Sequence, residues 1–83
     1  MYETIGDRIE VLTRFGQQGV RPLEFRWKGT AVPIREVTST WHRSEGTERK
    51  YYFSVVGETG DYYELCFDVR NLRWSLERVC LEG

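Results

Sequence analysis

The chain has few of the residues that cross-link or rigidify small proteins or that catalyse reactions: two Cys, two Pro and one His among 83 residues. Two Cys are too few for the disulfide framework of a small secreted domain. One His, with the two Cys predicted on opposite faces of a sheet, cannot complete a zinc site in a monomer. No glycine-rich phosphate-binding motif is present. We therefore expect no metal, no cofactor, no catalytic residues and no enzymatic activity.

Long apolar segments and a strong charge of one sign are also absent. The apolar runs are far too short for a signal peptide or a transmembrane helix, so we expect a cytoplasmic protein without membrane contact. The net charge is −1, which argues against a chain that binds nucleic acid through its overall charge. Basic residues are nevertheless in excess over residues 21–50, and acidic residues over residues 51–83.

What the sequence has is a repeated alternation of apolar and polar residues, which predicts β-strands. Hydrophobic residues make up 40% of the chain and aromatic residues 14%, enough for the core of a single domain over residues 1–83. A helix is left open only at the extreme N-terminus. We predict an all-β fold of about six antiparallel strands, forming a small barrel or a two-layer roll. The strands are expected over residues 8–14, 23–27, 31–41, 50–56, 62–69 and 74–81.

The hairpin over residues 50–69 has a register that can be derived. A three-residue loop over residues 58–60, with Gly60 in the left-handed conformation, is a common hairpin type. This loop gathers apolar residues on one face by the pairs Val55–Tyr63, Phe53–Leu65 and Tyr51–Phe67.

The next turn is placed at Asn71-Leu72. It predicts that Cys80 faces the core and Cys66 faces outward, through the pairs Val69–Trp74, Phe67–Leu76 and Leu65–Arg78.

The segment over residues 31–41 does not keep one alternation. Its apolar positions change parity near Arg35-Glu36, which predicts a β-bulge or bend, with Val37 and Trp41 as the later apolar positions. Pro33 cannot donate a hydrogen bond to a neighbouring strand, so this strand is expected at a sheet edge or with that side unpaired. In the preceding strand Leu23, Phe25 and Trp27 are expected to face inward.

Each of the three Trp residues lies beside a basic residue, a combination that can stack bases and contact phosphates. Trp27 and Trp74 share faces with apolar residues and are expected in the core, which leaves Trp41 as the Trp to be expected at the surface. The candidate nucleic-acid surface consists of Arg26, Lys28, Arg35, Trp41, His42, Arg43, Arg49 and Lys50. It predicts a binding module for single-stranded nucleic acid.

The alternative is a protein-interaction or homodimerisation module without nucleic-acid contact. Exposed Tyr, Trp and Arg are typical of interaction surfaces, and an edge strand can accept a partner strand. The arrangement of the basic residues distinguishes the two: convergence on one face with Trp41 exposed favours nucleic acid. Scattered charges beside an apolar, strand-edge patch favour a protein partner.

A further indication comes from the order of Arg21-Pro22, Phe25, Trp27-Lys28-Gly29, Val32, Val37, Trp41, Tyr52, Val55, Gly57, Tyr63-Glu64-Leu65, Asp68, Trp74, Leu76 and Val79. This order resembles a family of small bacterial domains of unknown function, DUF6504, over roughly residues 9–79. A similar stretch is found at the C-terminal end of some Y-family-polymerase-like proteins of bacterial mutagenic repair. The resemblance implies an accessory domain that acts near DNA-repair proteins and carries over no catalytic residues. Lys28 stands where Arg is expected, and no polymerase portion is present, so a role in synthesis does not transfer.

Overall fold

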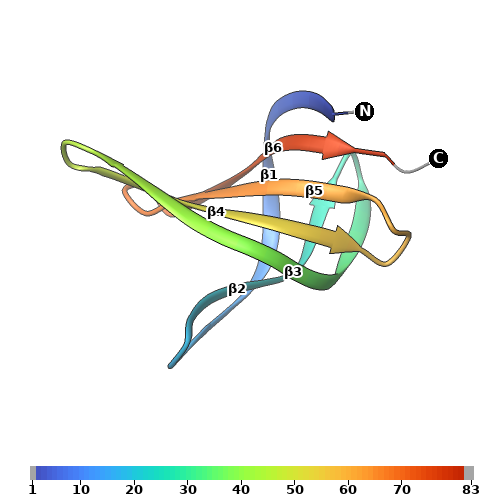
Figure 1. Cartoon of the computed structure of the whole chain (residues 1–83), viewed down its shortest axis with the longest axis horizontal. Helices are drawn as coiled ribbons and strands as arrows, with labels where there is room; N and C mark the ends of the chain where they lie inside the picture. Colours follow the sequence, from blue (N-terminus) through green and yellow to red (C-terminus); the bar gives the residue numbers. More distant parts are fainter. Residues whose placement is uncertain (1, 82–83) are drawn as a thin grey trace.

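The computed structural model describes residues 2–81, and this range contains strands and turns but no helix. Each strand is antiparallel to the next, and the last pairs with the first, so that the sheet closes into a ring (Figure 1). The prediction of an all-β domain of six antiparallel strands is confirmed. The strands are β1 (Tyr2–Gly16), β2 (Gly19–Trp27), β3 (Thr30–Glu45), β4 (Glu48–Gly57), β5 (Tyr62–Asp68) and β6 (Arg73–Cys80).

The N-terminal segment is a strand, so the helix left open there is wrong. Tyr2 lies opposite Cys80 and Ile9 lies opposite Trp74, and between them the pairing of β1 with β6 is interrupted near Gly6. Gly6 has φ of +78°, a conformation that glycine adopts without steric cost. The irregularity hides the alternation of residues 2–9, which explains why the sequence did not reveal this part of the strand.

The core lies inside the ring and consists mainly of alternate residues of strands β4, β5 and β6. Leu65 and Leu76 are fully buried, and the ring of Phe25 lies edge-on against Tyr63, with 4.9 Å between the ring centroids. Trp74 is buried, as predicted, and its ring lies against those of Phe53 and Phe67. The core cluster comprises Phe25, Phe53, Val55, Tyr63, Leu65, Phe67, Trp74, Leu76 and Val79.

The register of β4 and β5 is the predicted one. Val55 lies opposite Tyr63, and the same alignment continues along both strands. The Gly57 amide donates a 3.0 Å hydrogen bond to the Asp61 carbonyl, which leaves three residues in the loop, and Gly60 has φ of +94°. The loop geometry and the apolar pattern agree here, so local sequence was enough to fix this hairpin.

The predicted register of β5 and β6 is wrong. Asp68 and Arg73 are the last pair, and the connection uses residues 69–72, with Leu72 at φ of +57°. Leu65 therefore lies opposite Leu76 instead of Arg78, so that two apolar side chains meet in the core. The one register shift in this ladder, beyond this pair, leaves Val79 buried and turns Cys80 to the opposite face. The prediction that Cys80 faces the core is therefore wrong.

Strand β3 pairs with two different strands, one after the other along its length. Residues 30–33 pair with β2 and residues 34–45 pair with β4. Pro33 is the last residue in the ladder with β2, and its carbonyl accepts a 3.1 Å hydrogen bond from the Glu58 amide. The missing amide of Pro33 thus marks the point where β3 changes partner. The expectation of an edge strand is wrong, because β3 pairs with both β2 and β4. Its alternative is confirmed, since each half of β3 is paired along one side only.

Two bulges, not one, shift the parity of β3. The predicted shift lies between Ile34 and Glu36, and a second lies between Val37 and Ser39. The second shift places Val37 inward and Trp41 on the opposite, outward face.

A similar shift in β2, where Thr13 pairs with Pro22, buries Pro22 and leaves Leu23 39% exposed. Leu23 is therefore not the inward residue that the alternation predicted.

Candidate interaction cleft

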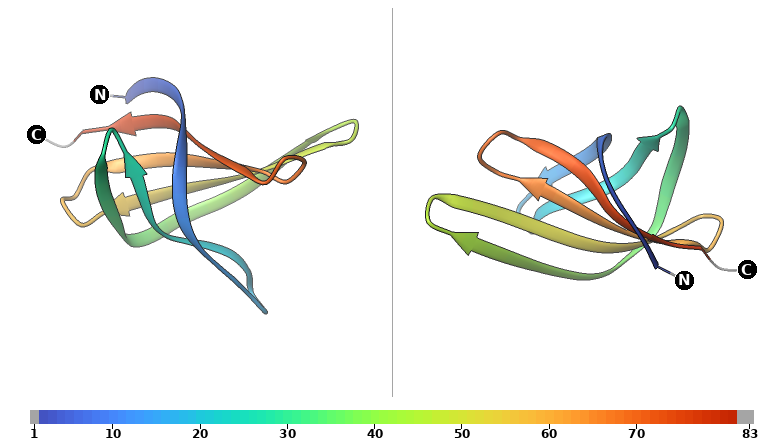
Figure 2. Two further views of the ribbon diagram at one scale, coloured as in Figure 1. Left: turned by 180° about the vertical axis from the view of Figure 1, so that it is seen from behind. Right: turned by 90° about the horizontal axis from the view of Figure 1, so that it is seen from above.

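The ring has an opening between the β1–β2 hairpin and the second half of β3. Residues 19–22 of β2 pair only with β1, whereas residues 36–45 of β3 pair only with β4. The β1–β2 and β3–β4 hairpins diverge at this side of the molecule (Figures 1 and 2). Two adjoining cavities of about 590 Å³ and 580 Å³ occupy the opening and share Gln18, Gly19, Val20, Thr40 and Phe53. We call the combined depression the cleft.

One wall of the cleft is the unpaired side of β3. The β3–β4 turn has two residues, Gly46 and Thr47, with Gly46 at φ of +59°. In such a hairpin the flanking pair, here Glu45 and Glu48, exchanges both backbone hydrogen bonds, and every second residue before it does the same. The residues between them direct their N–H and C=O groups away from β4. Thr40 and His42 belong to this second set and both line the cleft.

The second cavity of the cleft is mainly aromatic and apolar. Phe15 is 66% exposed and its ring lies edge-on to Phe67, with 6.1 Å between centroids. The His42 ring lies 5.9 Å from the Tyr51 ring. Leu72, which is 72% exposed, closes the same cavity. A concave surface of this size with exposed apolar side chains is the usual form of a binding site.

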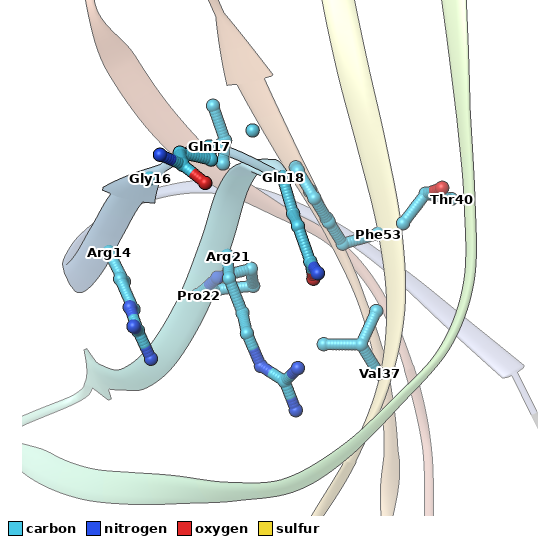
Figure 3. Close-up of a pocket in the computed structure, with 11 residues that line it drawn as sticks. Arg14, Gly16, Gln17, Gln18, Arg21, Pro22, Val37, Thr40 and Phe53 are labelled. Atoms are coloured by element: carbon cyan, nitrogen blue, oxygen red, sulfur yellow. The ribbon is translucent and has the colours of Figure 1, made fainter.

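The first cavity of the cleft is basic. Arg14 on β1 and Arg21 on β2 are directly opposite each other in the ladder and both line this cavity. Their side chains extend in the same direction, and Val37 and Thr40 form the other wall (Figure 3). Both arginines are exposed, and within residues 2–81 neither forms an ion pair with a carboxylate. The cleft therefore combines free backbone groups, aromatic rings and uncompensated positive charge.

The predicted nucleic-acid residues are only partly brought together. Trp41, Arg43 and Lys50 share the outward face of β3 and β4. Trp41 stacks on Tyr52 with 5.4 Å between centroids and 6° between planes, and the Arg43 guanidinium lies 5.5 Å from the Tyr52 ring. This stack adjoins a small cavity that is also lined by Glu45 and Glu48, so its charge is mixed.

The remaining candidates lie elsewhere. His42 and Arg49 are on the face opposite Trp41, although His42 and Trp41 both line the second cavity of the cleft. Lys28 lies by the β2–β3 turn, its Nζ 4.8 Å from the Trp27 ring centroid, and Arg26 precedes it on β2. This turn and the β3–β4 turn lie at opposite ends of β3 (Figure 2). Arg35 is in the first bulge of β3. The predicted set therefore does not form one surface.

Trp27 lies at the margin of the core rather than fully within it. Its ring packs against the core cluster, and its indole Nε1–H donates a 3.0 Å hydrogen bond to Asp7 Oδ2.

The sequence missed Arg14, Phe15, Arg21 and Leu72 as members of a site. A large aromatic residue beside the polar Gly16–Gly19 loop was the one local signal, because such a residue at a strand end is not needed for the core. The partners of Phe15 and the arginines come from β3 and β5, which are distant in the sequence.

Cys66 lies opposite Tyr52 on the outward face of β5, yet it is only 4% exposed. Burial raises the pKa of the Cys66 thiol, with the negative charge of Glu77 as a second cause. Burial likewise raises the pKa of Tyr52. A thiol that keeps its proton is a poor nucleophile, so this pair is not arranged as a reactive centre.

The described residues contain no group of three His, Cys, Asp or Glu side chains that could hold a metal ion. Residues 2–81 include no helix with the length and apolar character needed to span a bilayer.

Comparisons with family models, with curated proteins and with solved structures found no match to the chain. The family resemblance described above therefore stays a prediction.

Proposed function

We propose that this domain is a non-catalytic protein-interaction module that binds an extended peptide as an additional strand on the open side of β3. The observation that carries the proposal is the direction of the Thr40 and His42 backbone groups, which point into the cleft and not toward another strand. Unpaired strand edges bind extended peptides through main-chain hydrogen bonds, and neighbouring pockets select the side chains. The aromatic cavity beside β3 supplies such a pocket.

The position of the charges favours a peptide over a nucleic acid. The basic residues at the two ends of β3 are separated, and those near Trp41 lie among carboxylates. Nucleic acid is held mainly through phosphate contacts from a continuous basic surface. The cleft, by contrast, exposes Phe15 and Leu72, and exposed aromatic residues are enriched at protein interfaces. The resemblance to a repair-associated domain makes a DNA-repair protein a natural source of the peptide.

A matched pair of variants at Thr40 tests the backbone contact. Thr40→Pro removes the N–H that points into the cleft, whereas Thr40→Val keeps it and nearly keeps the side-chain shape. Proline is tolerated at strand positions whose N–H is not used in the ladder, and circular dichroism would verify that both variants fold. Twelve-residue peptides would be selected from a random display library on the wild-type protein, and their affinities measured by fluorescence polarisation. We expect Thr40→Pro to weaken binding about tenfold or more and Thr40→Val to change it little.

Three other outcomes would contradict the proposal. Selected peptides that bind Thr40→Pro and wild type equally would exclude the β3 edge. Failure to select peptides, together with salt-sensitive micromolar binding of a labelled 20-nucleotide single strand that Trp41→Ala abolishes, would favour nucleic acid. Concentration-dependent dimerisation in analytical ultracentrifugation that Thr40→Pro abolishes would assign the edge to a second copy of the chain.

A further inference from the structure

The Arg14–Arg21 pair is unusual for a strand ladder because two like charges lie directly opposite each other. Like charges in this position destabilise a pair of strands. The two described salt bridges of the molecule, Arg70–Glu48 at 3.5 Å and Arg78–Glu64 at 3.6 Å, are elsewhere and do not relieve the repulsion. The pair therefore places two positive charges, without a carboxylate partner among residues 2–81, at the wall of a cavity.

The shape of the cavity directs this charge toward a ligand in the cleft. The two side chains extend side by side along the wall that faces β3 (Figure 3). Guanidinium groups present paired N–H donors that match the two oxygens of a carboxylate. A carboxylate between them would cancel the repulsion and form charge-assisted hydrogen bonds.

We infer that Arg14 and Arg21 form a carboxylate clamp that selects a peptide with an Asp or Glu side chain close to an apolar anchor. This inference rests on the proposed function, because it names the chemistry of the peptide in the same cleft. The anchor occupies the aromatic cavity formed in part by Phe15 and His42. The clamp and the aromatic cavity adjoin, so one short peptide reaches both.

The register also sets the spacing of the two recognised side chains. Along the β1–β2 hairpin, Arg14 and Arg21 lie on the face opposite Phe15 and Val20, because neighbouring residues of a strand alternate faces. A strand placed between β2 and β3 continues this alternation. Its carboxylate and its apolar anchor must therefore come from opposite faces of the strand, so the two residues are neighbours or three apart, and not two apart.

Defined peptides test the clamp and the spacing together. The probes are ten-residue, amide-capped peptides of Thr and Ser with one Phe and one Glu, placed either next to each other or two residues apart. Each has a counterpart with Gln in place of Glu. Affinities would be measured by ¹H–¹⁵N chemical-shift titration, which also reports whether the Thr40 and His42 amides respond. The protein variants are the double change Arg14→Gln plus Arg21→Gln, with Arg8→Gln as the matched control on the part of β1 that pairs with β6.

We expect the neighbouring-Glu peptide to bind about fivefold to tenfold tighter than its Gln counterpart. The double variant should lower this preference below about twofold, Arg8→Gln should keep it, and the peptide with Glu two residues from Phe should show little preference. The unbound spectrum of the double variant verifies that it is folded.

The outcomes separate this inference from the proposed function. Equal binding of Glu and Gln peptides, or a Glu preference that survives the double variant, overturns the clamp. If Thr40→Pro still abolishes the binding of those peptides, the β3 site stands and only the clamp is wrong. If Thr40→Pro binds them as wild type does, or if no peptide of the series shifts the Thr40 and His42 amides, both proposals are wrong.

Discussion

Replacement of Leu76 by Ala tests the packing at the centre of the ring. Leu76 is 0% exposed and lies opposite Leu65, which is also 0% exposed. The change removes three buried carbon atoms, worth about 2.4 kcal/mol at about 0.8 kcal/mol each. The cavity that remains adds about 1–2 kcal/mol. We therefore expect Leu76→Ala to lower the free energy of unfolding by about 4 kcal/mol.

This loss is large for a domain of 83 residues, whose whole stability is expected to be about 4–12 kcal/mol. The midpoint of thermal unfolding should fall by about 15–30 °C. Urea titration followed by tryptophan fluorescence, to which the buried Trp74 contributes, and thermal circular dichroism would measure the change. The control is Leu72→Ala in the exposed connection, which should alter stability by less than about 0.5 kcal/mol. A loss below about 1 kcal/mol for Leu76→Ala would refute the buried position.

The same pair tests the corrected register of β5 and β6. Milder Leu65→Val and Leu76→Val changes keep the double variant folded, and their effects should be coupled by about 0.5 kcal/mol or more because the side chains touch across the ladder. Leu65→Val combined with Arg78→Ala should instead be additive, since Arg78 lies opposite Glu64. Coupling of Leu65 with Arg78, without coupling to Leu76, would restore the register predicted from the sequence.

Three further predictions concern stability. Gly57→Ala should destabilise the protein by about 1–3 kcal/mol in urea titrations, because the added Cβ would lie 3.1 Å from two packed side chains. The control is Gly16→Ala, whose Cβ would meet nothing within 4 Å and which should be neutral or slightly stabilising. Arg21→Gln should leave the midpoint of thermal unfolding unchanged or raise it, since it removes the repulsion from Arg14; a loss above about 1 kcal/mol would show that the pair is structural. Burial raises the pKa of Cys66 above its ordinary value of 9.0. Near and above that pH the unfolded chain therefore binds fewer protons than the folded one, so the free energy of unfolding should fall as pH rises. Cys66→Ala should flatten this dependence between pH 8 and 10.

The parts of the fold that follow from local pattern were predicted. The six strands and the β4–β5 register needed only the alternation of side chains and one loop type. Local pattern failed where a strand gains a residue. The shifts near Leu23 and after Val37 each exchange the inward and outward faces, and no particular residue type marks such a bulge.

The candidate site was the part least accessible to sequence reasoning. Trp41 and His42 are neighbours in the chain but lie on opposite faces of β3, so Trp41 stacks on Tyr52 and His42 lies near Tyr51, although both residues line the cleft. The sequence does not mark Arg14 and Phe15 as site residues, because the residues that line the cleft with them come from distant strands.

The sequence by itself determined the class of the fold, since strand alternation and turn chemistry act between residues that are close in the chain. Only the tertiary structure decided that β3 leaves β2 at Pro33 and pairs with β4 along one side. That change of partner opens the cleft and sets the arginine pair opposite the free backbone of Thr40. The reason is physical. The ring closes only if strands bend and change partners, and the contacts that stabilise this arrangement join segments distant in the sequence, which a local pattern cannot predict.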